Sequence, residues 1–275
     1  MIKDIVVNLG LGAHDPAGDY AVSVADAFKA HLLGVAFVYD PVIPGSVMGG
    51  IPAEFIEAQR AESTKQAQAA IARFEKAAKS AGISVESRVE NASSAGAANR
   101  LAQLARRFDI SIVGQPEHDK PLPEEIIAEG VLFESGRPVI VVPFIQKAGL
   151  KLDRVIAGWD GSRAATRAIA DAMPFLEKAK QVDVVIVAGD RGKSDEVPGA
   201  DLGQHLARHG VKVDVKRLTS PDIDVASTIL SYAADSSADL LVMGGYGHSR
   251  LREFVLGGAT RGIMHAMTLP TLMSH

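Results

Sequence analysis

The residues with the clearest chemical meaning lie in one segment, "MGGYGHSRLREFVLGGAT", Met243 to Thr260. It follows "ADLLVM", an apolar run typical of a buried strand. Glycine lets backbone N–H groups approach a ligand closely and permits positive φ, and the helix predicted for "RGIMHAM" would present unpaired N–H groups to an anion. The segment therefore predicts a loop that holds a polyphosphate from two sides. Its glycines form two groups: Gly244, Gly245 and Gly247, then Gly257 and Gly258.

Three other motifs suggest competing chemistry. "GLG" at residues 10–12, with Asp40 after the second predicted strand, partly fits a dinucleotide fingerprint but lacks its third glycine. His205 and His209 have a helical spacing that can bind zinc, but no third ligand is evident nearby, so exposed helix residues explain them better. "GYGHS" around His248 lacks the first histidine of a His-x-Gly-His nucleotidyl-transfer motif.

Catalytic motifs are missing from the sequence. It contains no Gly-x-x-x-x-Gly-Lys-Ser/Thr, no Gly-x-Ser-x-Gly and no convincing acid–base pair around the predicted loop. Cysteine is absent, which excludes disulfides, thiolate metal sites and thiol nucleophiles. The sequence therefore predicts a binding site without catalytic residues or metal ligands.

The composition limits the classes of partner. A hydrophobic share of 47% and a charged share of 23% in 275 residues predict folded cores. The formal net charge of −4 argues against a nucleic-acid or acidic-membrane partner. No run approaches the ~20 apolar residues of a membrane span, and Asp4 interrupts what would be the apolar core of a signal peptide. We expect a soluble cytoplasmic protein.

The chain contains an internal repeat. "KDIVVNLG" matches "LDRVIAGWD", with Asp4 at the place of Asp153, and "GISVESRV" matches "GVKVDVKRL", with Gly82 at the place of Gly210. Two halves of about 140 residues therefore follow one order of elements. We predict one domain over residues 1–147 and a second over 148–275.

Each half alternates predicted strands and helices. Strands that are apolar throughout and joined by amphipathic helices are typical of a parallel sheet covered on both faces. The fold class is therefore α/β, doubly wound, in which ligands bind at the carboxyl ends of the strands where strand order reverses. The strands predicted in the second half are 153–158, 182–188, 211–217, 239–244 and 270–274.

Matching positions of the two halves lie 149 residues apart at the first strand (153 − 4) but only 128 apart at Gly82 (210 − 82). The first half therefore carries about 21 extra residues between Asp40 and Gly82. Its predicted core is "PVIPGSVMGGIPAEF". An exposed apolar segment of this kind favours aggregation. We therefore expect residues 41–63 to pack over the cleft of the first half or to contact a second copy of the chain.

Gly244-x-x-Gly247, nine residues and then Gly257 resemble the ATP-binding signature of universal stress proteins. Asp160 in "GWDGS" and the final "LPTL" strand extend the resemblance, which covers the chain end to end as a tandem member. The resemblance implies five parallel strands in each half, ordered 3-2-1-4-5, and halves paired as a pseudo-dimer through their last strands. It also implies an ATP-binding regulatory protein of the stress response. A slow ATPase or phosphotransferase, or an interaction protein that binds no nucleotide, are the alternatives.

The resemblance assigns the site residue by residue. Trp159 and Asp160 would lie by the adenine and ribose, and ATP, alone or with Mg²⁺, would be the cofactor. The family usually has Ser or Thr where this chain has Gly258, so one hydroxyl contact is lost while the backbone N–H remains. Further residues carried over are Val187 at the adenine, Met243 and Gly244 at the floor, and Gly247, Gly257, Gly258, Ala259 and Thr260 around the phosphates.

The first half departs further from the signature. Glu117 stands at the place of Gly247, and Leu11 at the place of Asp160, although Asp15 could reach in. Carboxylates would face a phosphate where the second half has bare amides. We expect one nucleotide site per chain, in the second half, and a degenerate first half that is structural or binds another ligand. The partners expected are the nucleotide and a second copy of the chain.

Overall fold

The computed structural model describes residues 1–40, 52–116, 124–188, 199–219, 224–245 and 258–275. The strands of the first half are β1 (Asp4–Asn8), β2 (His31–Tyr39), β3 (Glu86–Ala92), β4 (Ile110–Gly114) and β5 (Val139–Val142). Those of the second half are β6 (Val155–Gly158), β7 (Val182–Ala188), β8 (Val213–Thr219), β9 (Leu240–Gly244) and β10 (Thr271–Ser274). The five strands predicted in the second half therefore exist; the bounds of β7 are as predicted, and those of the other four differ by at most two residues.

All ten strands form one sheet, in the order β3-β2-β1-β4-β5-β10-β9-β6-β7-β8. Each ladder is parallel except that between β5 and β10, where the two halves meet antiparallel. The predicted α/β class is confirmed. The halves join through their last strands into a continuous sheet.

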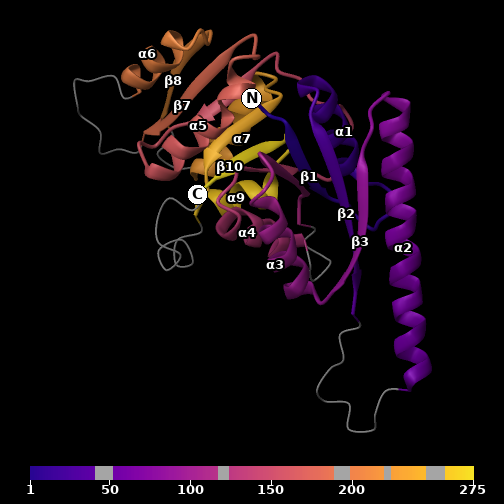
Figure 1. Ribbon diagram of the computed structural model, residues 1–275. Helices are drawn as coiled ribbons and strands as arrows, with labels where there is room; N and C mark the ends of the chain where they lie inside the picture. The colour runs from indigo at the N-terminus through magenta and orange to yellow at the C-terminus, as the bar shows by residue number, and fades with distance from the viewer. Residues whose placement is uncertain (41–51, 117–123, 189–198, 220–223, 246–257) are drawn as a thin grey trace.

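Helices cover both faces of this sheet (Figure 1). Two separate apolar cores result, one on each side. Along β6, Val155 and Ala157 face the first core and Ile156 the second, because successive side chains of a strand point to opposite faces. The helices of the first core are α1 (Pro16–Phe28), α2 (Ala53–Ser80), α5 (Arg163–Leu176) and α6 (Ala200–Arg208). Those of the second are α3 (Ser94–Ala105), α4 (Glu124–Glu134), α7 (Val225–Asp235) and α9 (Ala259–Ala266).

The contacts between the halves follow the repeat. Phe28 at the end of α1 packs edge-on against Phe175 of α5, with ring centroids 4.8 Å apart. Helix pairs also pack alike within each half: a Cβ on Gly130 would lie 3.1 Å from Ala98, and a Cβ on Gly262 would lie 2.7 Å from Ala226. The repeat seen in the sequence is therefore a repeat of packing as well as of element order.

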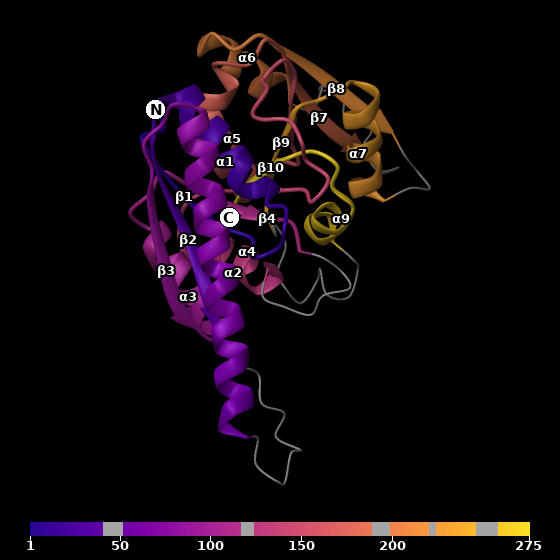
Figure 2. The same cartoon turned by 90° about the vertical axis from the view of Figure 1, so that its right-hand side faces the viewer.

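The insertion in the first half is partly helical. α2 has 28 residues, whereas α6, its counterpart, has nine. Its first ten residues are exposed apart from the half-buried Ile56, and Phe55 is 52% exposed. In both views this end of α2 projects beyond the sheet (Figures 1 and 2). Residues 53–62 therefore do not pack over the described part of the first half, while 41–51 lie outside the described residues.

The long helix α2 is not a membrane segment. Its sequence carries charged residues throughout, such as Glu54, Arg60 and Glu75. In the part of the chain that the structure describes, no helix is long and apolar enough to cross a membrane.

Candidate nucleotide site

The predicted site lies where the chain changes direction across the sheet. β6 and β9 are neighbours in the second half. From β6 the chain continues into α5 on one face, and the helix that follows β9, α9, packs on the other face. In a doubly wound sheet such a switch point leaves a crevice at the carboxyl ends of the two strands.

Asp160 stands at the end of β6 and is exposed. Its Oδ1 accepts a hydrogen bond from the Ser162 N–H at 2.9 Å, and Gly161, with φ of 75°, makes this tight turn possible. Ser162 Oγ in turn accepts from the Ala165 N–H at 3.1 Å and caps α5. Ser162 supplies the helix cap, so Asp160 is not needed for it. Asp160 Oδ2 makes no hydrogen bond to the residues that the structure describes.

Gly244 ends β9 against the first turn of α5. A Cβ on Gly244 would lie 2.5 Å from the Ala165 N atom and 2.9 Å from Ala164 Cβ, so only glycine fits. Met243 is buried, and its Cβ lies 3.6 Å from the position of a Cβ on Gly158. Gly158, Met243 and Gly244 therefore lie together as the floor between β6 and β9, and the packing of α5 alone accounts for the glycine at 244.

Trp159 and Val187 lie on opposite faces of the sheet. The half-buried indole of Trp159 packs on the α5 and α6 side, beside Ile186 and 3.5 Å from a Cβ position on Gly199, the N-cap of α6. Val187 packs on the α7 and α9 side. The structure therefore does not bring these two side chains together, and their contact with an adenine stays a prediction.

The N-cap residue of α9 supplies no side-chain cap. Gly258 is its N-cap, with φ −53° and ψ 153°, so any residue could take this conformation. The first N–H groups of a helix have no partner within the helix. Thr260 is buried, so the backbone around Gly258 and Ala259 remains as the group that can meet a phosphate. Gly247 and Gly257 lie outside the described residues.

Gln115, which the sequence did not single out, fixes the other end of α9. It follows β4 in the first half and is buried. Its Nε2 donates to the carbonyl oxygens of Met264 at 2.9 Å and His265 at 3.2 Å, the last turn of α9. Its Oε1 accepts from the Phe144 N–H at 3.3 Å. A polar residue directly after a buried strand is the only hint the sequence carries, because the contact exists only once the halves pack together.

The corresponding loop of the first half is arranged differently. Arg73, from α2, donates to the carbonyl oxygens of Gly12 at 2.6 Å and Gly10 at 3.3 Å. Asp15 caps α1 by accepting from the Gly18 N–H at 3.1 Å, and burial raises the pKa of its carboxyl to about 6. The loop is thus tied to α2, and its acid serves a helix cap where the second half has the exposed Asp160.

The histidine pair does not form part of a larger ligand cluster. His205 and His209 lie one turn apart on α6, with ring centroids 4.7 Å apart. Over the described residues, no group of three or more His, Asp or Glu side chains is arranged to hold a metal ion.

Comparison with known proteins supports the resemblance. Residues 151–275 match the sequence profile of the Universal stress protein family. A universal stress protein of Synechocystis sp. is 26% identical over 178 residues, 62% of this chain, and the match spans only 60% of the length of that protein.

Solved structures extend the match to the first half. A universal stress protein from Archaeoglobus fulgidus DSM 4304 is 15% identical, has a TM-score of 0.73, and aligns over 98% of this chain and 96% of its own, so it has the same fold. A universal stress protein solved in complex with cAMP is 21% identical, with a TM-score of 0.36, over 51% of this chain and 97% of its own. Residues 151–275 therefore match the universal stress protein family, and the two tandem domains of the chain together have the fold of a universal stress protein.

Proposed function

We propose that the second half binds one ATP per chain at the carboxyl ends of β6 and β9, and that the protein is a nucleotide-responsive regulator. The observation that carries this proposal is the N-terminus of α9, whose N-cap Gly258 has no side chain, beside a switch point of the sheet. Unpaired N–H groups and the partial positive charge of a helix N-terminus suit a phosphate. Asp160, exposed at the end of β6, is the group we assign to the ribose.

The contrast between the halves supports a single site. α4, the counterpart of α9, carries Glu125 in its first turn, and this carboxylate opposes an anion at the N-terminus of the helix. The loop after β1 is held by Arg73 and carries Leu11 at the place of Asp160. The first half is therefore proposed to support the second half without binding a nucleotide.

A regulator is favoured over an enzyme because the described residues of the site hold no acid–base pair. Asp160 is bonded to its own turn, and among the described residues around β6 and β9 no second carboxylate or histidine pairs with it. A phosphotransferase would need a group that positions the attacking hydroxyl or water. Slow ATP hydrolysis and an interaction protein without nucleotide remain the alternatives.

Mass analysis of small molecules released from the purified full-length protein tests the proposal, followed by calorimetric titration with ATP, adenosine and cAMP. We expect ATP in the released material, with stronger binding of ATP than of adenosine because the phosphates meet α9. If cAMP binds more tightly than ATP, the ligand of the site is a cyclic nucleotide and not the triphosphate. Turnover well above that of a passive site, in an assay with Mg²⁺, would favour the enzyme.

A further inference from the structure

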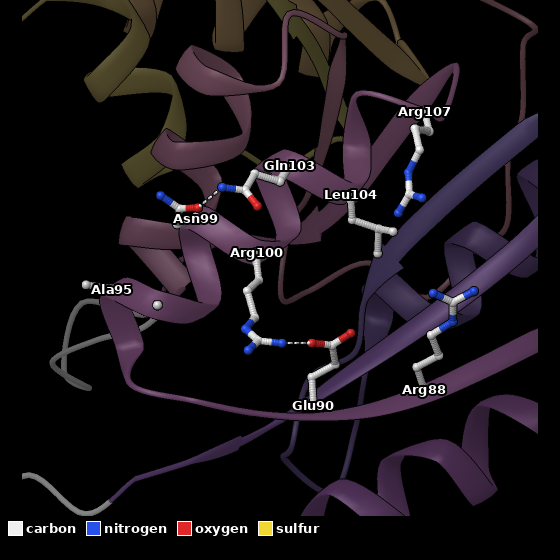
Figure 3. A pocket seen from close by; sticks show the side chains of 9 residues that line it. Arg88, Glu90, Ala95, Asn99, Arg100, Gln103, Leu104 and Arg107 are labelled. Carbon is white, nitrogen blue, oxygen red and sulfur yellow. Dashed lines mark hydrogen bonds and ion pairs between the residues drawn. The ribbon is translucent and has the colours of Figure 1, made fainter.

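A polar groove lies in the first half, between the edge strand β3 and helix α3 (Figure 3). Its volume is about 890 Å³. Five strands, β2, β1, β4, β5 and β10, separate β3 from the β9–β6 pair in the sheet order, so this groove is distinct from the nucleotide site. The polar side chains that line it are Arg88, Glu90, Asn99, Arg100, Gln103 and Arg107.

The groove concentrates positive charge in a chain whose net charge is −4. Three guanidinium groups and one carboxylate line it. Arg100 is paired with Glu90, Nη1 to Oε2 at 2.6 Å. Arg88 lies 3.5 Å from Glu86, which also contacts His31, and the guanidinium of Arg107 makes no hydrogen bond or ion pair to the residues that the structure describes. The guanidinium groups of Arg88 and Arg107 therefore keep most of their N–H donors available to a ligand.

The repeat keeps a cation at only one of these three positions. Lys216 is the counterpart of Arg88 in the second half (216 − 88 = 128). At an offset of 130 or 131, Arg100 corresponds to Leu230 or Ser231. Arg107 corresponds to Ser237 or Ala238 on the same offsets. Charges on β3 also protect an exposed sheet edge from pairing, but that function does not extend to arginines on and after α3.

We propose that this groove binds a compact polyanion, a small molecule with two or more phosphate groups. The planar fork of arginine matches phosphate oxygens in pairs. Gln103 Nε2 donates to Asn99 Oδ1 at 2.6 Å, which leaves the Asn99 amide group free to act as a further donor. Among the described residues that line the groove there is no aromatic ring, so we assign the groove to charge and not to a stacked base.

Titration of the full-length protein with inorganic tripolyphosphate at low salt tests this proposal. Replacing Arg88 and Arg107 together by Gln should weaken binding at least tenfold. A control with Arg60→Gln and Arg208→Gln, exposed residues outside the groove, changes the net charge equally and should leave the affinity within twofold. Added NaCl should weaken binding, because the contact is between exposed charges.

Tripolyphosphate can also meet the N-terminus of α9, so the titration is repeated with Gly258→Asp, which places a carboxylate there. If tripolyphosphate still binds Gly258→Asp but not the double Arg variant, it binds in the groove. This result does not depend on whether ATP binds the second half. Equal loss in the double variant and its control, or loss only in Gly258→Asp, would overturn the proposal. So would an acidic peptide that binds the groove while tripolyphosphate does not. Unfolding midpoints of all variants confirm that they are folded.

Discussion

The substitution Gly258→Asp separates phosphate binding from helix stability. Gly258 caps α9 without a side chain, and its φ of −53° suits any residue. An Asp at this position would add a side-chain cap and complement the helix dipole, so the unliganded protein should gain a few tenths of a kcal/mol of stability. The same carboxylate would face the phosphates of ATP.

The expected loss of affinity follows from charge. Two unit charges about 5 Å apart, at an effective dielectric constant of about 20, interact by about 3 kcal/mol. Counterions and side-chain rotation reduce this repulsion, so ATP affinity should fall about tenfold to a hundredfold. Gly258→Asn is the matched control, since it caps the same N–H groups without charge and should lose much less.

Calorimetric titration of both variants with ATP and adenosine measures the effect, and thermal unfolding without ligand checks the fold. Adenosine affinity should differ little between Asp and Asn, because adenosine has no phosphate. If stable Asp and Asn variants bind ATP equally well, the N-terminus of α9 does not face the phosphates and the geometry of the site is wrong.

Three further substitutions test the framework of the site. Gln115→Leu removes both donors to the last turn of α9, so we expect a loss of about 1–3 kcal/mol in unfolding free energy and a severalfold weaker ATP affinity; an unchanged unfolding midpoint would mean that the carbonyls find other donors. Gly244→Ala should cost about 1–3 kcal/mol because its Cβ meets backbone at 2.5 Å. At Gly114, the counterpart at the end of β4, a Cβ has nothing within 4 Å, so Gly114→Ala should cost little; equal costs in chemical denaturation would contradict this packing. The pKa of Asp15, raised to about 6 from 3.8, means that the folded state holds an extra proton between about pH 4 and 6, so stability falls as pH rises through this window. Asp15→Asn should remove that slope and stabilise the protein by about 1–3 kcal/mol at pH 7, as measured by urea unfolding across pH; an unaltered slope would contradict the burial of this carboxyl.

The fold was predictable because its strands are short apolar runs that alternate with amphipathic stretches, and because the halves repeat each other. The length of α2 was not: after Pro52 its sequence is rich in Ala, Gln and charged residues, so no strong apolar stripe marks it. The Pro- and Gly-rich stretch before it led us to expect an insertion that packs over the first half or contacts a second copy. Residues 53–62 instead extend as a helix that is exposed within the single chain.

The site was predictable only as far as local sequence determines it. Asp160, Ser162 and Gly258 take positions that their own neighbours define, a turn and two helix N-termini. Gln115 and the indole of Trp159 depend on packing between elements distant in sequence. The groove between β3 and α3 likewise depends on packing. Arg88 lies on a strand and Arg107 follows the next helix, so the two line one surface only in the folded protein.

The number of ATP molecules bound by the full-length chain tests the central claim most directly. Isothermal titration of protein freed of co-purified nucleotide should give one site per chain, abolished or strongly weakened in Gly258→Asp and retained in Arg88→Gln with Arg107→Gln. Two equivalent sites would contradict the degenerate first half. No binding of ATP by the folded, nucleotide-free protein would contradict the nucleotide site itself.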